Sequence, residues 1–118
     1  MGSMASKSAT ELLRLPVQLH GIRLGRPVDL LLDLVEWRAL GFAVLCGDEG
    51  VRFLPFPAAD VREDAIHVQS ALVLLEDVEF YRQRSRSLRD LLRSELKDLL
   101  VAPDGVVTSV ESGRVSTA

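Results

Sequence analysis

Turn-forming residues interrupt the chain every eight to twelve positions from Leu15 onward, and the apolar segments between them are short. This spacing is typical of an all-β sandwich or a small barrel. No uninterrupted apolar run approaches the roughly 18 residues that a membrane-spanning helix needs. We therefore expect a mainly β fold, built as a small β-barrel of five to six short strands.

The predicted strands are bounded by glycine or proline, and several alternate between two faces. They comprise residues 15–20, 28–35, 40–46, 51–54, 65–68 and 71–75. Residues 28–35 also suit a helical period, but Asp29 and Asp33 share one strand face, which favours a strand. Gly47 and Gly50 predict a hairpin turn between two of the strands, because glycine adopts positive φ without strain.

The segment after residue 76 allows two structures. Ser87 and Asp90 resemble a capping box, with Asp in place of the usual Glu or Gln, so a helix begins directly after Ser87. In one interpretation this helix continues to residue 100, because leucines recur at helical spacing. In the other it ends near residue 93, and a Pro-Asp-Gly turn joins two further strands. We favour the second interpretation, a short helix followed by a C-terminal β-hairpin over 96–111.

Length and charge bound the organisation of the chain. Its 118 residues suffice for one domain, and a net charge of -3 argues against a protein that coats nucleic acid. The single Cys46 suits a reducing compartment, and no secretory signal opens the chain, so we expect a cytoplasmic location. We expect a disordered tail that begins with a cloning remnant over 1–14 and a β domain over 15–76. An Arg-rich connector with a short helix over 77–95, the hairpin over 96–111 and a flexible tail over 112–118 are expected to follow.

Three short motifs resemble the PRC-barrel family, which is named after the H subunit of the photosynthetic reaction centre. Residues 21–30 (GIRLGRPVDL) are similar to the family's opening Gly-x-x-Leu-Gly stretch, 53–56 to its aromatic-Leu-Pro strand end, and 64–68 to the strand that follows. Pro27 departs from the common form of the first motif. The resemblance spans residues 15–76 and implies a PRC-type barrel.

The same resemblance implies a docking module rather than an enzyme. One type of PRC-barrel protein assists ribosome maturation by binding a small-subunit ribosomal protein, and another caps a membrane complex. The pattern also recurs in part, because residues 98–101 (DLLV) echo residues 29–32 (DLLL). A lone hairpin is marginally stable, so the C-terminal hairpin must pair with the barrel or with another copy of the chain. This reasoning predicts a homodimer.

The residues that could act in catalysis or bind a metal do not occur at the spacing that such sites need. His20 and His67 lack further ligands at metal-binding spacing, so we expect surface histidines. Cys46 falls on an apolar strand face and is expected in the core. Asp29 and Asp33 lie roughly 13 Å apart along a strand, beyond the roughly 5 to 9.5 Å of glycosidase carboxylate pairs. We therefore predict no enzymatic activity, cofactor, metal or small-molecule substrate.

Positive charge is concentrated over residues 82–97, where six basic residues face two acidic ones, a local balance of +4. Such asymmetry can steer RNA phosphate, anionic lipid or an acidic protein, although a solvated linker is the simpler interpretation. The outward face of the sheet is expected to carry Leu31, Val35, Leu45 and Leu54, covered both by the helix that starts near Leu88 and by a second chain.

These features predict a non-enzymatic interaction or adaptor module with an unidentified protein partner. The alternative is an RNA- or ribosome-associated assembly factor that uses the Arg-rich segment 82–93, and an anionic membrane surface is a further, less favoured partner. The predicted partner-binding residues are Leu31, Leu45, Leu54, Phe56, Arg82, Arg84 and Arg86.

Overall fold

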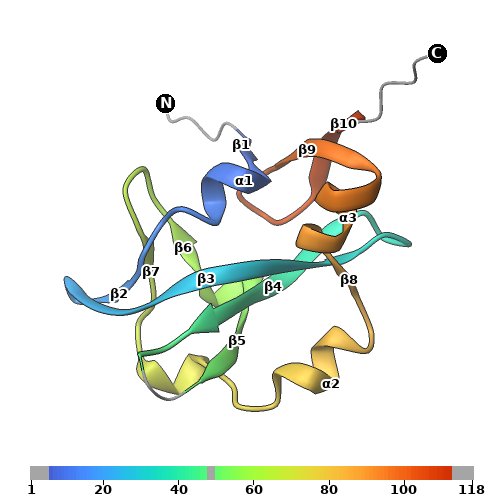
Figure 1. Cartoon of the computed structure of the whole chain (residues 1–118). Helices are drawn as coiled ribbons and strands as arrows, with labels where there is room; N and C mark the ends of the chain where they lie inside the picture. Colours follow the sequence, from blue (N-terminus) through green and yellow to red (C-terminus); the bar gives the residue numbers. More distant parts are fainter. Residues whose placement is uncertain (1–5, 48–49, 113–118) are drawn as a thin grey trace.

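The computed structural model describes residues 6–47 and 50–112, and it is mainly β, as predicted (Figure 1). A larger sheet has the strand order β5-β4-β3-β2-β7-β6, with β8 as a further neighbour of β3. A smaller sheet has the order β1-β9-β10. The strands are β1 (Lys7–Ser8), β2 (Val17–Leu19), β3 (Ile22–Asp33), β4 (Arg38–Leu45), β5 (Val51–Pro55), β6 (Asp60–Val61), β7 (Ile66–His67), β8 (Arg86–Ser87), β9 (Leu96–Val101) and β10 (Val107–Ser112).

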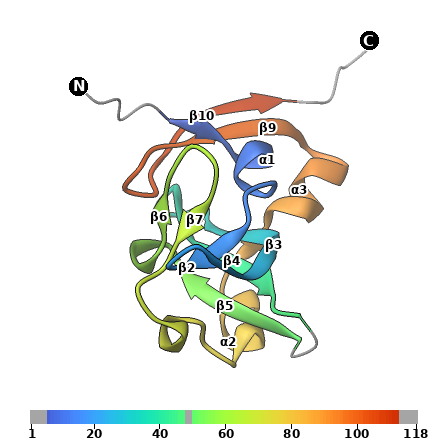
Figure 2. The same ribbon diagram turned by 90° about the vertical axis from the view of Figure 1, so that its left-hand side faces the viewer.

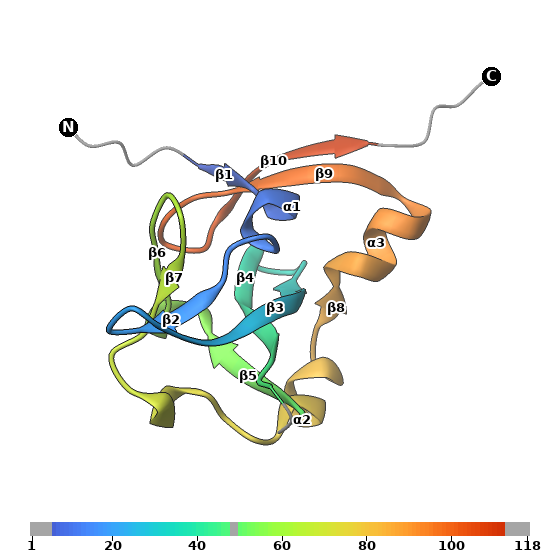
Figure 3. The same cartoon turned by 60° about the vertical axis from the view of Figure 1, so that its left-hand side comes forward.

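Short helices connect and cover the two sheets. They are α1 (Ala9–Leu12), α2 (Val78–Arg82) and α3 (Leu88–Ser94), together with the 3-10 turns η1 (Phe56–Ala58) and η2 (Ala71–Val73). Figures 2 and 3 show the small sheet along one end of the molecule, with α1 and α3 beneath it and α2 at the far end. Among the described residues no ladder joins β5 to β6, so the large sheet does not close on itself.

The C-terminal hairpin is confirmed. The Ser87 hydroxyl caps α3 by accepting the Asp90 amide at 3.3 Å, and the helix ends before Glu95, which leaves the helical region at φ -130°. Beyond that point burial alternates with a period of two: Leu99 and Val101 are buried, whereas the residue between them is exposed. Two-residue periodicity is the signature of a strand with one buried face, which decides against a continued helix.

Two predictions about segments are wrong. Residues 71–75 do not form a strand: Ser70 caps a 3-10 turn there, and only Leu75 pairs, in a bridge with Phe53. Nor are residues 7–14 disordered, because they form β1 and α1, and Ala9 and Leu12 are buried in the main core. The residues expected to be a cloning remnant, the centre of the 47–50 turn and the end of the C-terminal tail lie outside the described residues.

The chain contains an internal repeat that goes further than the sequence indicated. Ser8 accepts the Glu11 amide at the start of α1, as Ser87 does with the Asp90 amide at the start of α3. The helix sequences correspond, SATELLR from residue 8 and SLRDLLR from residue 87. The halves are interleaved: β1, which precedes α1, pairs with β9, whereas β8, which precedes α3, pairs with β3.

The β3–β4 and β9–β10 hairpins also correspond in register. Ser8 lies opposite Leu100 and Ser87 opposite Leu31, in each case two residues beyond an aspartate. Both ladders shift register twice, at equivalent places. The shifts lie between Pro27 and Asp29 and between Leu31 and Leu32 in β3, and between Leu96 and Asp98 and between Leu100 and Val101 in β9. This register makes Asp98 the equivalent of Asp29, and Val110 the equivalent of Phe42.

The repeats meet where Arg38 and Val106 form an isolated antiparallel bridge. The Ala39 amide donates to the carbonyl of Gly105 at 2.7 Å, and the Val107 amide donates to the carbonyl of Trp37 at 2.8 Å. These bonds are reciprocal, so a pseudo-two-fold axis passes between the hairpins. Trp37 and Gly105 are equivalent and both have positive φ, at 55° and 94°, so the two turns share a backbone conformation that is rare in tryptophan.

Candidate functional site

The sheet face that was expected to bind a partner is covered by the chain's own α2. Leu31 is only 1% exposed and packs with Ala43 and Phe53, and above them Val78 is buried and the Tyr81 ring stacks on Phe53 at 3.9 Å. The prediction that Leu31 is an available contact residue is therefore wrong. An apolar outer face exists, as the sequence indicated, but the helix that packs on it is α2 and not the one that begins at residue 88.

Two further predicted contacts belong to the main core. Leu54 lies opposite Phe42 in the β4–β5 ladder, and cross-strand partners share a face, so it points inward and is fully buried. Phe56 is 3% exposed and stacks on Phe42, with 5.7 Å between the ring centroids. Leu45 is half-buried. Of the residues predicted on the outer face, Val35 alone is freely exposed, in the turn between β3 and β4.

The basic residues from 82 to 97 each have a partner within the chain. The pairs are Arg82 with Asp29 and Glu79, Arg84 with Phe80, Arg86 with Glu95, Arg89 with Val28, Arg93 with Asp90 and Lys97 with Glu111. The Arg84 guanidinium also lies 3.8 Å above the centre of the Phe80 ring. Exposed pairs of this kind each contribute about 0–1 kcal/mol to the free energy of unfolding, so they orient these side chains but add little stability.

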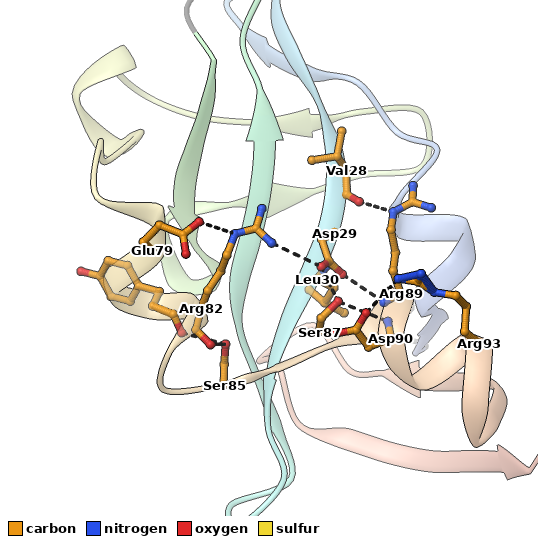
Figure 4. Close-up of polar contacts among 11 residues, drawn as sticks. Val28, Asp29, Leu30, Glu79, Arg82, Ser85, Ser87, Arg89, Asp90 and Arg93 are labelled. Atoms are coloured by element: carbon orange, nitrogen blue, oxygen red, sulfur yellow. Dashed lines mark hydrogen bonds and ion pairs between the residues drawn. The ribbon is translucent and has the colours of Figure 1, made fainter.

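Asp29 is the buried acidic residue that ties the connector to the sheet (Figure 4). Its carboxylate accepts the Leu30 amide at 2.8 Å, the Arg89 amide at 3.1 Å and the Ser87 hydroxyl at 2.5 Å. Arg82 approaches the same carboxylate to 4.0 Å from the other side. Because its acceptor sites are filled by donors of α3, β8 and its own strand, Asp29 has a structural role.

Asp98 repeats this arrangement in the second half of the chain. It accepts the Leu99 amide at 2.8 Å, the Thr10 amide at 3.2 Å and the Thr10 hydroxyl at 2.7 Å, and so fixes α1 to β9. Burial alone would raise the pKa of Asp98, but the hydrogen bonds from Thr10, Leu99 and Ser8 together outweigh it, and the pKa lies below its ordinary value. Donors that hold the ionised form lower a carboxyl pKa in this way.

Two adjoining clefts flank the segment 59–62. The first, which we call the β1–β6 cleft, has a volume of about 650 Å³ and lies between β1, α1, that segment and the end of β9. Its apolar lining consists of Leu12, Phe56, Ala59, Val61, Val101, Ala102 and Pro103. Its charged lining consists of Lys7, Glu11, Asp60, Arg62 and Glu63. Phe56 is the one predicted partner-binding residue that lines this cleft.

The second cleft, which we call the histidine cleft, has a volume of about 850 Å³ and contains both histidines. His67 lies opposite Asp60, whose carboxylate accepts two hydrogen bonds from Arg62, at 2.9 and 2.7 Å. His20 and Gly21 both have positive φ and form the two-residue turn between β2 and β3. Across the described residues, no three His, Cys, Asp or Glu side chains are grouped so that they could hold a metal ion.

Strand β6 lines the β1–β6 cleft and forms an edge of its sheet among the described residues. The amides of Ile66 and Val68 donate to β2 and its preceding residue, so the backbone of His67 between them faces β6. In an antiparallel pair, hydrogen-bonded and non-hydrogen-bonded positions alternate. Asp60 therefore exchanges hydrogen bonds with His67, and the N–H and C=O of Val61 point away from β7. Within residues 6–47 and 50–112, β6 ends the strand order of its sheet, so no strand described there pairs with those two groups.

The concave surface was not predicted from the sequence, which gave residues 57–61 no functional signal. The chain's one cysteine, Cys46, is buried and is not among the residues that line either cleft. In the described part of the chain no helix is long and apolar enough to cross a membrane. The sequence matches no protein-family model and no curated protein at a significant level.

Proposed function

We propose that this chain is a non-enzymatic protein–protein interaction module of the PRC-barrel type, which acts in the cytoplasm and binds an extended segment of its partner in the β1–β6 cleft. The proposal is carried by edge strand β6, where the N–H and C=O of Val61 point away from β7 beside the partly apolar lining of the cleft. A partner strand gains main-chain hydrogen bonds at such an edge, and the pocket beneath it selects side chains.

The charges around the cleft indicate the character of that segment. Asp60 and Arg62 neutralise each other through two hydrogen bonds. Glu11 and Glu63 line the same cleft, opposed by Lys7. The remaining rim is therefore slightly acidic, and we expect the bound segment to place an apolar side chain over Phe56 with a basic residue beside it.

The intramolecular pairing of the arginines favours a protein partner over RNA. A phosphate-binding surface needs cations that can exchange small counterions for the nucleic acid backbone. In the connector each cation already has a carboxylate, carbonyl or aromatic partner within the chain. The RNA-associated function stays an alternative, tested by replacing Arg84 and Arg86 with Ser, since Arg82 also contacts the buried Asp29.

The proposal is tested by selecting nine-residue peptides from a phage-displayed library on the full chain, and measuring affinity with the most enriched peptide in labelled form. Val61→Pro removes the outward N–H, and proline is tolerated at an edge where that group faces solvent. Val61→Thr is the matched control, because it keeps the amide and a similar side-chain shape. We expect Val61→Pro to weaken binding about tenfold and Val61→Thr to leave it nearly unchanged.

Cleft shape provides a second test with the same peptide. Ala59 lines both clefts, so Ala59→Trp fills them and should abolish binding, whereas Ala71→Trp places the same bulk at an exposed site outside them. Far-UV circular dichroism and a thermal melt establish that each variant is folded. Failure of the library to yield any peptide, or equal affinity for Val61→Pro and Val61→Thr, would contradict docking at this edge.

A further inference from the structure

We propose that the chain also self-associates, through antiparallel pairing of β10 with β10 of a second copy. This interface lies on the small sheet, so it goes beyond the proposed function and does not depend on it. The inference comes from the internal repeat, which places β10 in the position that β4 occupies in the first half of the chain.

The two equivalent strands differ in their neighbours. β4 lies between β3 and β5, whereas β10 ends the strand order of its sheet within the described residues. From Ser109 to Ser112 every residue of β10 is exposed. The position that β5 fills in the first half is therefore open in the second, and an open edge of this kind is a template for another strand.

Irregularities in β10 do not block that edge. Register shifts often protect edge strands, and β10 has two in its ladder with β9. However, β4 has two equivalent shifts in its ladder with β3, and its ladder with β5 runs unbroken from Gly41–Pro55 to Leu45–Val51. A strand with these shifts can thus accept a regular partner on its other side.

The repeat also fixes which backbone groups of β10 face outward. The Cys46 amide donates to the Gly50 carbonyl, across the β4–β5 hairpin. Because the direction of the backbone groups alternates along a strand, residues 42 and 44 also direct their N–H and C=O groups toward β5. The equivalent residues of β10 are Val110 and Ser112. The amide of Val107, earlier in β10, donates to the Trp37 carbonyl, on the side of the strand that faces away from β9. The free edge therefore offers the N–H and C=O groups of Val110 and Ser112.

Charge and shape select one register for the pairing of two copies. With the two-fold axis at Val110, that side chain, 42% exposed in the monomer, meets its twin, and Glu111 lies opposite Ser109. An axis at Glu111 would oppose two carboxylates, which is destabilising for directly opposite residues. Of these two registers, the one centred on Val110 is therefore favoured for pairing with a second copy. One strand pair buries less than the roughly 800 Å² per partner of a standard interface, so the dimer is expected to be weak.

Sedimentation velocity over concentrations up to about 1 mM tests this directly. The wild type should shift from monomer to dimer, and Val110→Asp, which opposes two carboxylates across the axis, should weaken dimerisation at least about tenfold. Val35→Asp is the matched control, a charged replacement of an exposed valine in the β3–β4 turn, and should dimerise like the wild type. A wild type that stays monomeric throughout, or a Val110→Asp chain that dimerises normally, would overturn the proposal.

Hydrogen exchange of the unaltered chain gives a readout that does not depend on how a variant folds. The amides of Val110 and Ser112 should exchange more slowly as the protein concentration rises, whereas the Glu111 amide, which faces β9, should not change. Equal exchange of Val110 and Ser112 at low and high concentration would place any dimer interface elsewhere. The peptide measurements on Val61 stand independently of this result.

Discussion

Replacing Asp29 by Ala should be among the most damaging single changes in this chain. The substitution removes one acceptor from three donors: the Leu30 amide, the Arg89 amide and the Ser87 hydroxyl. Each buried donor left without a partner costs about 1–3 kcal/mol, and two of the three are only partly buried. We therefore expect a loss of about 4 kcal/mol in the free energy of unfolding, against a total of about 5–15 kcal/mol for a domain.

Asp29→Asn separates the hydrogen bonds from the charge. The amide oxygen can still accept from Leu30 and Arg89, and the Ser87 hydroxyl can rotate to accept from the new NH₂ group. Only the strengthening of these bonds by the negative charge and the attraction to Arg82 are lost, so the expected cost is about 1.5 kcal/mol. Asp98→Ala is the comparison at the equivalent site, where greater exposure should limit the cost to about 2 kcal/mol.

Urea unfolding followed by far-UV circular dichroism measures all three variants. With a slope of about 2 kcal/mol/M, Asp29→Ala should lower the midpoint by about 2 M, and Asp29→Asn by less than half of that. If Asp29→Ala unfolds within about 1 kcal/mol of the wild type, the connector is not held by these bonds. If Asp98→Ala proves the costlier change, burial is not what separates the two equivalent sites.

The pKa of Asp98 and the cover over the outer sheet face give two further predictions. Because the pKa of Asp98 is lower in the folded than in the unfolded chain, its stabilisation is complete above the unfolded value of about 3.9 and is lost as the pH falls through the folded value. Asp98→Asn should therefore flatten the fall of the urea midpoint below about pH 4; an unchanged acid slope would show that other carboxyls dominate. Tyr81→Ala removes the ring that stacks on Phe53, so it should cost about 3 kcal/mol and expose enough apolar surface to increase binding of a hydrophobic dye. Dye binding equal to that of the wild type would mean that α2 stays in place without Tyr81.

Local signals in the sequence determined several elements correctly. The capping box at Ser87 is a bond between residues three apart, so its outcome does not depend on distant parts of the chain. The same holds for the turn at Gly105, where positive φ favours glycine. Beyond that turn, a β-branched run favoured a strand, and β10 begins at Val107. In each case the energy that decides the structure comes from neighbours along the chain.

The assignment of faces and partners was decided by tertiary structure. Alternation along a strand shows that Leu30 and Leu31 point to opposite sides, but not that α2 covers Leu31. Likewise, the recurrence of Asp-Leu-Leu at residues 29–31 and 98–100 was visible in the sequence, yet the exchange of the two helices between halves was not. The packing of each helix on the other half depends on contacts between residues about 60 to 90 positions apart. The entropy lost in closing such long loops and the surface buried by the contacts are not encoded in any local sequence pattern.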